Sequence, residues 1–108
     1  MSTNITIEGI PFICVNLSEA DFADRAAIYV ILCVAKDGTW RVLDVGQSGQ
    51  VGTRIDNHDR QDCWRHNCPS NNIWVCIYPM PTDQYTETDR LKVERKLRLK
   101  FNPPCGLR

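Results

Sequence analysis

The sequence predicts an α+β domain, with a small, three-stranded, mostly antiparallel sheet flanked by helices. Residues 26–35 (AAIYVILCVA) form a continuous apolar run rich in β-branched residues, as expected of a buried strand. Asp37-Gly38 is a two-residue hairpin signal, and residues 39–46 (TWRVLDVG) then return antiparallel. The charged segment over residues 82–101 predicts the longest helix, which ends at the following Asn-Pro-Pro.

The chain is expected to be one domain, residues 1–108, in which residues 1–25 extend a core of residues 26–106. The extension is expected to contain a short strand or extended arm over residues 5–15, interrupted from Gly9 to Pro11, and a short helix near residues 18–25. The core elements are predicted in this order: strands over 26–35 and 39–46, a helix over about 51–66, a strand over 73–80 and a helix over 82–101.

Charge and hydropathy exclude several classes of protein. The 13 basic and 13 acidic residues balance, so no overall field draws the chain to nucleic acid or to an anionic membrane. Cations are nevertheless concentrated between Arg90 and Lys100. The start of the chain has no basic n-region, and no apolar run approaches the roughly 20 residues of a membrane span. We therefore expect a cytoplasmic protein that does not enter a membrane.

The six cysteines are not expected to form a disulfide framework, because the cytoplasm is reducing. Cys33 and Cys76 lie inside apolar runs and are predicted to be small core residues. A zinc site is an alternative, although the segment HDRQDCWRHNC lacks the paired C-x2-C typical of zinc knuckles. Its potential ligands are His58, Cys63, His66 and Cys68.

The hairpin register brings polar residues together. If Asp37-Gly38 is the turn, Tyr29 lies opposite Gly46, and Asp44 lies two residues along on the same face. Such diagonal positions are about 7–8 Å apart, within reach of a shared ligand. Gly46 would leave open space beside them.

Two helices are expected to add charged side chains to this face. Arg54 and His58 are related as i and i+4, so they share one side of their helix. Glu94 falls on a core-facing arc of the last helix, where a carboxylate must be paired or bound to a cation. Each residue also has a purely structural reading. Tyr29 could belong to the core, Asp44 to a turn, and Arg54 could pair with Glu94.

The order and spacing of these residues resemble the GIY-YIG nuclease superfamily over roughly residues 26–106. Ala27-Ile28-Tyr29 resembles the first motif of the family with alanine in place of glycine, and Asp44-Val45-Gly46 the second with aspartate in place of tyrosine. Arg54, His58 and Glu94 fall where the family has its arginine, its histidine or tyrosine, and its metal-binding glutamate. FNPPCG resembles the closing Asn-Pro-Pro-Cys-Asn segment, with Gly106 in place of the final asparagine.

The resemblance implies metal-dependent hydrolysis of a phosphodiester by an endonuclease, most simply acting on DNA. Glu94 would hold one Mg²⁺ or Mn²⁺ ion against a phosphate oxygen, and Arg54 would bind the scissile phosphate. Tyr29 would position or deprotonate the attacking water, alone or with His58. By the same resemblance, the residues expected to contact substrate are Gly46, Gln47, Ser48 and Asn102.

Asp44 leaves two functions open. As a carboxylate it could accept a proton, orient the water or join Glu94 at the metal; alternatively, it marks a non-catalytic module that binds nucleic acid or protein. Retention of the other four positions favours the enzyme. With no separate DNA-binding module, affinity would have to come from the basic stretch 90–100, from a partner protein or from homodimerisation.

Overall fold

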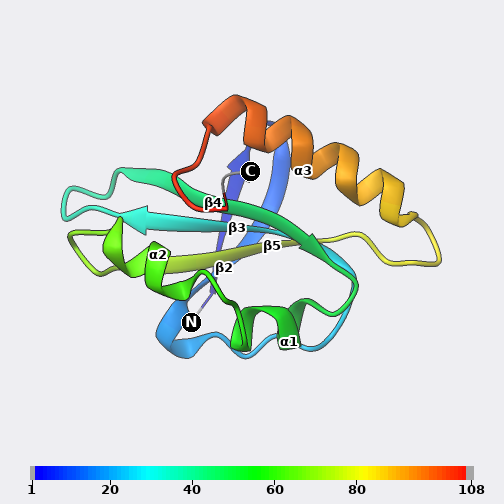
Figure 1. Cartoon of the computed structure of the whole chain (residues 1–108), viewed down its shortest axis with the longest axis horizontal. Coiled ribbons are helices and arrows are strands. Elements are labelled where there is room, and N and C mark those ends of the chain that lie inside the picture. The colour runs from blue at the N-terminus through cyan, green and yellow to red at the C-terminus, as the bar shows by residue number, and fades with distance from the viewer. Residues whose placement is uncertain (1, 107–108) are drawn as a thin grey trace.

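In the computed structural model, which describes residues 2–106, the chain forms a five-stranded antiparallel sheet with three α-helices (Figure 1). The strand order is β1-β2-β5-β3-β4. The elements are β1 (Ser2–Ile7), β2 (Ile10–Asn16), the 3-10 turn η1 (Leu17–Glu19), β3 (Ala27–Val34), β4 (Trp40–Ser48), α1 (Val51–Asp56), α2 (Gln61–His66), β5 (Ile73–Pro79) and α3 (Glu87–Phe101). The α+β class is confirmed, but the prediction of a three-stranded sheet is wrong.

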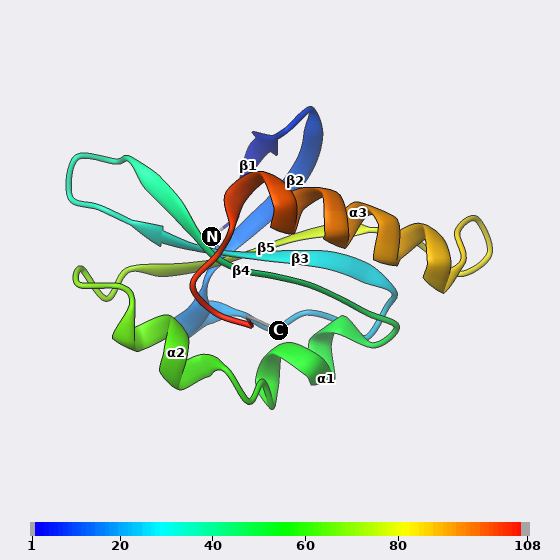
Figure 2. The same cartoon turned by 45° about the horizontal axis from the view of Figure 1, so that its top comes forward.

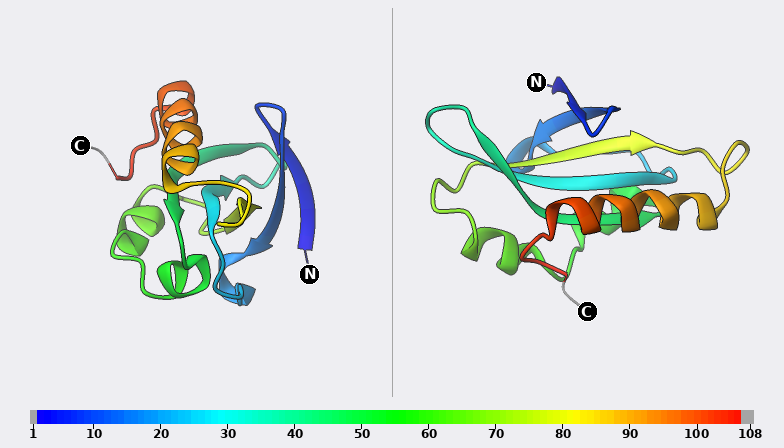
Figure 3. Two further views of the ribbon diagram at one scale, coloured as in Figure 1. Left: turned by 90° about the vertical axis from the view of Figure 1, so that its right-hand side faces the viewer. Right: turned by 90° about the horizontal axis from the view of Figure 1, so that it is seen from above.

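The two additional strands come from the N-terminal segment. β1 and β2 form a hairpin in which Ile7 pairs with Ile10. Its two turn residues, Glu8 and Gly9, both have positive φ, at 50° and 78°. A two-residue hairpin turn of this kind normally uses Asn or Asp before glycine, so a glutamate there gives no sequence signal. β2 pairs with β5, which places this hairpin at the opposite edge of the sheet from β4 (Figure 3).

Helices cover both faces of the sheet. Figure 2 shows α3 on one face and the short α1 and α2 on the other. The α3 face buries Leu97 against a cluster that includes Val30 and Val45. The opposite face buries Ile55 of α1 and Trp64 of α2. β4 is an edge strand, so side chains from both layers can reach its free edge.

The predicted helices differ from the observed ones at their ends. The helix expected over residues 51–66 is interrupted between α1 and α2, where the backbone N–H of Arg60 donates to His58 Nδ1 at 3.1 Å. Such local bonds between side chain and backbone compete with helical hydrogen bonds. The helix expected near residues 18–25 is only the η1 turn, and α3 starts at Glu87, where Thr86 and Asp89 form a capping box.

The predicted pairing of Tyr29 with Gly46 is confirmed. The turn, however, has three residues, with Gly38 at φ 88°, because the N–H of Ala35 donates to Thr39 O. Next to the turn, the pairing of β3 with β4 is therefore shifted by one residue from the predicted register. An irregularity between Ile31 and Leu32 brings the pairing back to the predicted register. These two departures from the ideal hairpin cancel at the end of the strands that carries Tyr29.

All six cysteines are paired, contrary to the expectation of free thiols. The disulfides are Cys14–Cys76, Cys33–Cys68 and Cys63–Cys105. Cys33 and Cys76 are buried, as predicted, but as half-cystines. The first bridge links directly opposed residues of β2 and β5, and this pairing of the N-terminal segment with the sheet was not predicted. Separately, no helix within residues 2–106 is long and apolar enough to cross a membrane.

Candidate active site at the edge of strand β4

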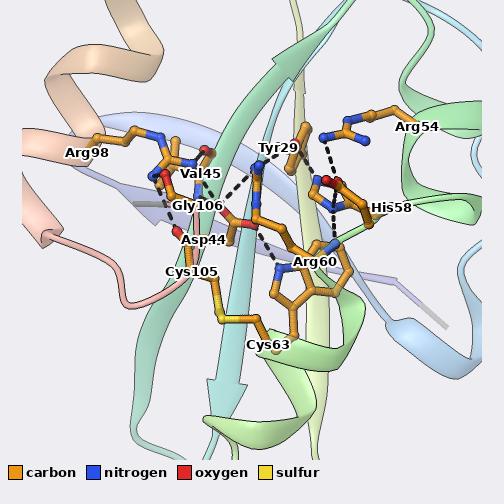
Figure 4. Close-up of polar contacts among 12 residues, drawn as sticks. Tyr29, Asp44, Val45, Arg54, His58, Arg60, Cys63, Arg98, Cys105 and Gly106 are labelled. Atoms are coloured by element: carbon orange, nitrogen blue, oxygen red, sulfur yellow. Dashed lines mark hydrogen bonds and ion pairs between the residues drawn. A yellow bond between two sulfur atoms is a disulfide. The ribbon is translucent and has the colours of Figure 1, made fainter. Parts of the chain in front are cut away.

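Four of the five predicted catalytic residues lie around one polar cluster at the β4 edge (Figure 4). Tyr29 comes from β3, Asp44 from β4 and Arg54 from α1, while His58 precedes α2. Arg98 of α3 completes the cluster. It reaches Asp44 from the side opposite Arg60 (Figure 4).

Tyr29 and His58 form a buried hydrogen bond of 2.6 Å between Oη and Nε2. The other ring nitrogen, Nδ1, accepts from the backbone N–H of Arg60, so a neutral imidazole must carry its hydrogen on Nε2. Burial, followed by the nearby charges of Arg54 and Arg60, lowers the pKa of His58 to about 4. At neutral pH the imidazole is therefore uncharged and donates to the phenol oxygen of Tyr29.

The phenol of Tyr29 is fixed in place by its surroundings. Its Oη also lies 3.5 Å from Arg60 Nη2, a second donor. Burial and the charge of Asp44 raise the pKa of Tyr29, so it is a phenol at neutral pH. Gly46 is required beneath it, because a Cβ at position 46 would lie 2.2 Å from the Cζ and Oη atoms of the ring. The ring occupies the space where a side chain on β4 would point.

Asp44 is fully buried, and its carboxylate is already satisfied by protein donors. Arg60 Nε donates to Oδ2 at 2.8 Å, and Arg98 Nη2 donates to Oδ1 at 2.8 Å. Oδ2 also accepts from Trp64 Nε1 at 2.8 Å, and Oδ1 from the N–H of Val45 at 2.9 Å. With these acceptor sites in use, Asp44 is neither a free metal ligand nor a free proton acceptor.

The C-terminal segment covers the Asp44 cluster. The N–H of Cys105 donates to Leu43 O at 3.0 Å, which holds this segment along the edge of β4. Gly106 follows with φ 76°, and a Cβ there would come within 2.9 Å of Asp44 Oδ1 and 2.6 Å of Arg98 Nη2. A close approach and a positive φ together account for a glycine at position 106.

The sequence prediction missed Arg60, Trp64 and Arg98. A usable signal existed, because a carboxylate inside an apolar strand needs a cation or several donors nearby. Nothing in the sequence identifies which cation it is, however, since Arg60 and Arg98 resemble ordinary surface charges. Arg98 lies 54 residues from Asp44 along the chain.

Arg54 lies at the exposed side of the Tyr29–His58 pair. Its side chain is 34% exposed, and its Nη2 lies 3.2 Å from Asp59 Oδ1. The alternative in which Arg54 pairs with Glu94 is therefore not the one observed. The same Asp59 oxygen lies 3.5 Å from His58 Nδ1. An anionic oxygen thus already sits between the guanidinium and the imidazole.

Glu94 is half-buried on α3 and is not joined to Tyr29 or His58 by a hydrogen bond in the described part of the chain. Arg90 Nε donates to Gln47 Oε1 at 3.0 Å, and Arg98 Nη2 donates to Val45 O, so the turn of α3 that carries Glu94 runs alongside Gly46. Within residues 2–106, no cation lies within 4.0 Å of its carboxylate.

The donor set fits a single-carboxylate Mg²⁺ site but not a cage made by the protein. Mg²⁺ commonly uses one or two carboxylates with substrate phosphates and water. Within residues 2–106, the oxygens of Glu94 accept no side-chain hydrogen bond, whereas those of Asp44 accept several. No group of three or more His, Cys, Asp or Glu side chains with metal-binding geometry is present among residues 2–106.

The residues expected to contact substrate have local structural partners. Gln47 accepts from Arg90, and Ser48 Oγ accepts from the N–H of Gln50 at 2.9 Å. Asn102 ends α3 in the left-handed conformation, with φ 45°. For the zinc alternative, the sulfurs of Cys63 and Cys68 are both in disulfides and are not available as thiolates.

No family model matches this chain, and neither the curated proteins nor the solved structures provide a match. The resemblance to GIY-YIG nucleases therefore depends on the motifs and their spacing.

Proposed function

We propose that the protein is a metal-dependent endonuclease that hydrolyses phosphodiester bonds, with DNA as its substrate. The observation that supports this most strongly is the buried Tyr29–His58 hydrogen bond next to the partly exposed guanidinium of Arg54. Burying two polar rings against each other is useful when their orientation must be fixed before a substrate arrives.

In this proposal a substrate phosphate replaces Asp59. The carboxylate of Asp59 is 74% exposed, and a surface ion pair of this kind contributes little stability. A phosphate oxygen in the same position would lie against Arg54, whose planar guanidinium binds phosphate through two hydrogen bonds. It would also lie beside the His58 ring.

Tyr29 orients the attacking water rather than deprotonating it at neutral pH. Its oxygen accepts from His58 and Arg60, which leaves its own hydrogen to be donated toward the reacting group. His58 holds the phenol in that orientation. Asp44 acts one step further away, because it anchors the guanidinium of Arg60 that touches the phenol.

Glu94 would hold the divalent cation. The cation supplies charge stabilisation for the phosphate as negative charge develops on the leaving oxygen. The support for Glu94 is that its carboxylate has no cationic partner among residues 2–106, although Arg90 and Arg98 lie one turn away on either side.

The enzyme proposal is tested by nicking of supercoiled plasmid in Mg²⁺. Tyr29→Phe and Arg54→Gln should each lower the initial rate by about 100-fold or more. Arg65→Gln is the matched control, because Arg65 is an exposed arginine of α2 that pairs with Asp62 and Gln61 of the same helix, and its rate should equal that of the wild type. If the wild type cuts neither DNA nor RNA with Mg²⁺ or Mn²⁺, the enzyme proposal fails.

A second candidate is a non-catalytic module that binds nucleic acid or protein. Burial favours it, because Tyr29 is only 1% exposed and the charge of Asp44 is neutralised by two arginines. This candidate predicts metal-independent DNA or protein binding without any nicking, and unchanged binding in Tyr29→Phe.

DNA affinity would be supplied by α3 together with a second copy of the chain or a partner protein. The formal net charge is zero, so binding by a monomer should be weak and sensitive to salt. Four cations of α3 are exposed and could contact phosphates: Lys92, Arg95, Lys96 and Lys100.

The disulfides change the expected location. Three buried or half-buried bridges are typical of proteins in oxidising compartments, so we propose such a compartment rather than the cytoplasm. Alkylation of the denatured protein immediately after cell lysis tests this. Without reductant, none of the six cysteines should be alkylated. Six reactive thiols would instead place the protein in a reducing compartment.

A further inference from the structure

Arg90 is a buried cation without a buried counter-ion. It is 5% exposed and lies in the first half of α3, facing the sheet. In the part of the chain that the structure describes, the guanidinium makes one hydrogen bond, from Nε to the side chain of Gln47, and its Nη1 is buried without a partner. Within residues 2–106, no carboxylate lies within 4.0 Å of it. A charge in this position is costly unless a ligand compensates it.

The guanidinium faces the turn that joins β4 to α1. A Cβ built on Gly49 would meet one atom within 4 Å, Nη2 of Arg90, at 4.0 Å. A methyl group on Gly49 would thus just touch the guanidinium, which lies next to this exposed turn. Gln47 accepts from Arg90 through Oε1, and its amide nitrogen makes no hydrogen bond in the described chain. Arg90 and the neighbouring Gln47 side chain thus both carry hydrogen-bond donors without a partner among residues 2–106.

We propose that Arg90 and Gln47 bind an oxyanion, and that this oxyanion is a phosphate of the nucleic-acid backbone flanking the one that is cleaved. Arginine is suited to this task because its planar guanidinium can donate two parallel bonds to one phosphate. Gln47 directly follows Gly46, which lies under the Tyr29 ring. Successive strand residues point to opposite faces, so Gln47 and Arg90 lie on the α3 face, across the edge strand β4 from the phenol of Tyr29. A nucleic-acid backbone that contacts both would pass around this free edge.

This inference rests on the proposed function only in naming nucleic acid as the source of the phosphate. The role of Arg90 as an anion ligand can be tested without cleavage. Arg90→Met removes the charge and keeps much of the volume, whereas Arg90→Lys keeps the charge and loses the two-pronged geometry. Arg65→Gln is the matched control, because Arg65 is an exposed arginine of α2 and not of α3.

The first measurement is thermal unfolding of the wild type and the variants with and without inorganic phosphate. Phosphate should raise the Tm of the wild type and of Arg65→Gln but not that of Arg90→Met. Without phosphate, Arg90→Met should be at least as stable as the wild type, because it removes an uncompensated buried charge. A loss of stability in Arg90→Met, or an equal phosphate response in all proteins, would overturn the anion site.

The second measurement is binding of a fluorescent DNA oligonucleotide in EDTA between about 50 and 200 mM salt. Arg90→Met should raise the Kd by about tenfold or more. It should also reduce the slope of log K against log salt concentration by about 1, the change expected when one phosphate contact is lost. Arg90→Lys should keep the wild-type slope with an intermediate Kd. A further outcome is that phosphate raises the Tm of the wild type but not of Arg90→Met, while both bind DNA with the same Kd and slope. The anion is then free phosphate, and the assignment to the nucleic-acid backbone is wrong.

These results are separable from the nuclease proposal. If phosphate and DNA binding depend on Arg90 but the protein does not nick DNA, the anion site is supported and the enzyme proposal fails. If nicking depends on Tyr29 but Arg90→Met binds phosphate and DNA as the wild type does, the enzyme proposal is supported and the anion site fails.

Discussion

Asp44→Asn is the substitution that tests the structural role of the buried carboxylate most sharply. It keeps the shape of the side chain and removes its charge. Arg60 and Arg98, whose side chains are 22% and 16% exposed, then lose their counter-ion. The new amide also presents N–H groups where an oxygen now accepts, so at least two donors lose their acceptor.

The expected loss of stability is about 3–5 kcal/mol, the usual consequence of removing one partner of a buried ion pair. For a chain of 108 residues this corresponds to a fall in Tm of about 13–22 °C, given the typical unfolding entropy per residue. The assay is urea and thermal unfolding under non-reducing conditions, so that the disulfides stay intact in every variant.

The matched control is Asp62→Asn. Asp62 pairs with Arg65 on the surface of α2, so its loss should leave the unfolding midpoint unchanged. Asp44→Asn should also lower any nicking rate, because Arg60 loses the anchor that holds it against the phenol of Tyr29. An Asp44→Asn protein as stable and as active as the wild type would refute the proposed role of this carboxylate.

Three further predictions concern stability. Gly46→Ala should destabilise by about 1–3 kcal/mol in urea unfolding, because its Cβ would meet the phenol at 2.2 Å, whereas Gly49→Ala should be tolerated. The pKa of His58 in the folded state is about 4, below its ordinary 6.5, so the unfolded state takes up a proton first as the pH falls. The free energy of unfolding should therefore fall by about 1.4 kcal/mol per pH unit between pH 6.5 and about 4. His58→Gln should not show this pH dependence. Replacing Cys63 and Cys105 by alanine opens a loop of 42 residues and should lower the free energy of unfolding by about 4 kcal/mol. A loss of less than about 1 kcal/mol would contradict the presence of this disulfide.

The sequence was sufficient for the local parts of the fold. The strand predicted over residues 73–80 is β5, Ile73–Pro79, and the pairing of Tyr29 with Gly46 follows from a hairpin signal only a few residues away. Periodicity and turn chemistry depend on neighbouring residues, so they can be read directly. The β1–β2 hairpin was missed because Glu8 takes a positive φ, which the sequence does not indicate.

The parts of the site that depend on distant contacts could not be predicted. Arg54 and His58 could be placed near Tyr29 from spacing alone, but Arg98 reaches Asp44 only because α3 packs along β4. The disulfides likewise depend on tertiary structure, since Cys63 and Cys105 meet when the C-terminal segment closes over the β4 edge. A cysteine count gives the number of possible bridges but not their partners.

The most direct test of the proposed function is the Mg²⁺ dependence of plasmid nicking by the wild type and Glu94→Gln. Glu87→Gln, an exposed glutamate in the first turn of α3, is the control. We predict that the wild type and Glu87→Gln show no nicking in EDTA and a rate that saturates with Mg²⁺, and that Glu94→Gln is slower on the order of 100-fold. Equal rates for wild type and Glu94→Gln at every Mg²⁺ concentration would contradict a metal site at Glu94, and equal rates in EDTA and Mg²⁺ would contradict metal-dependent hydrolysis altogether.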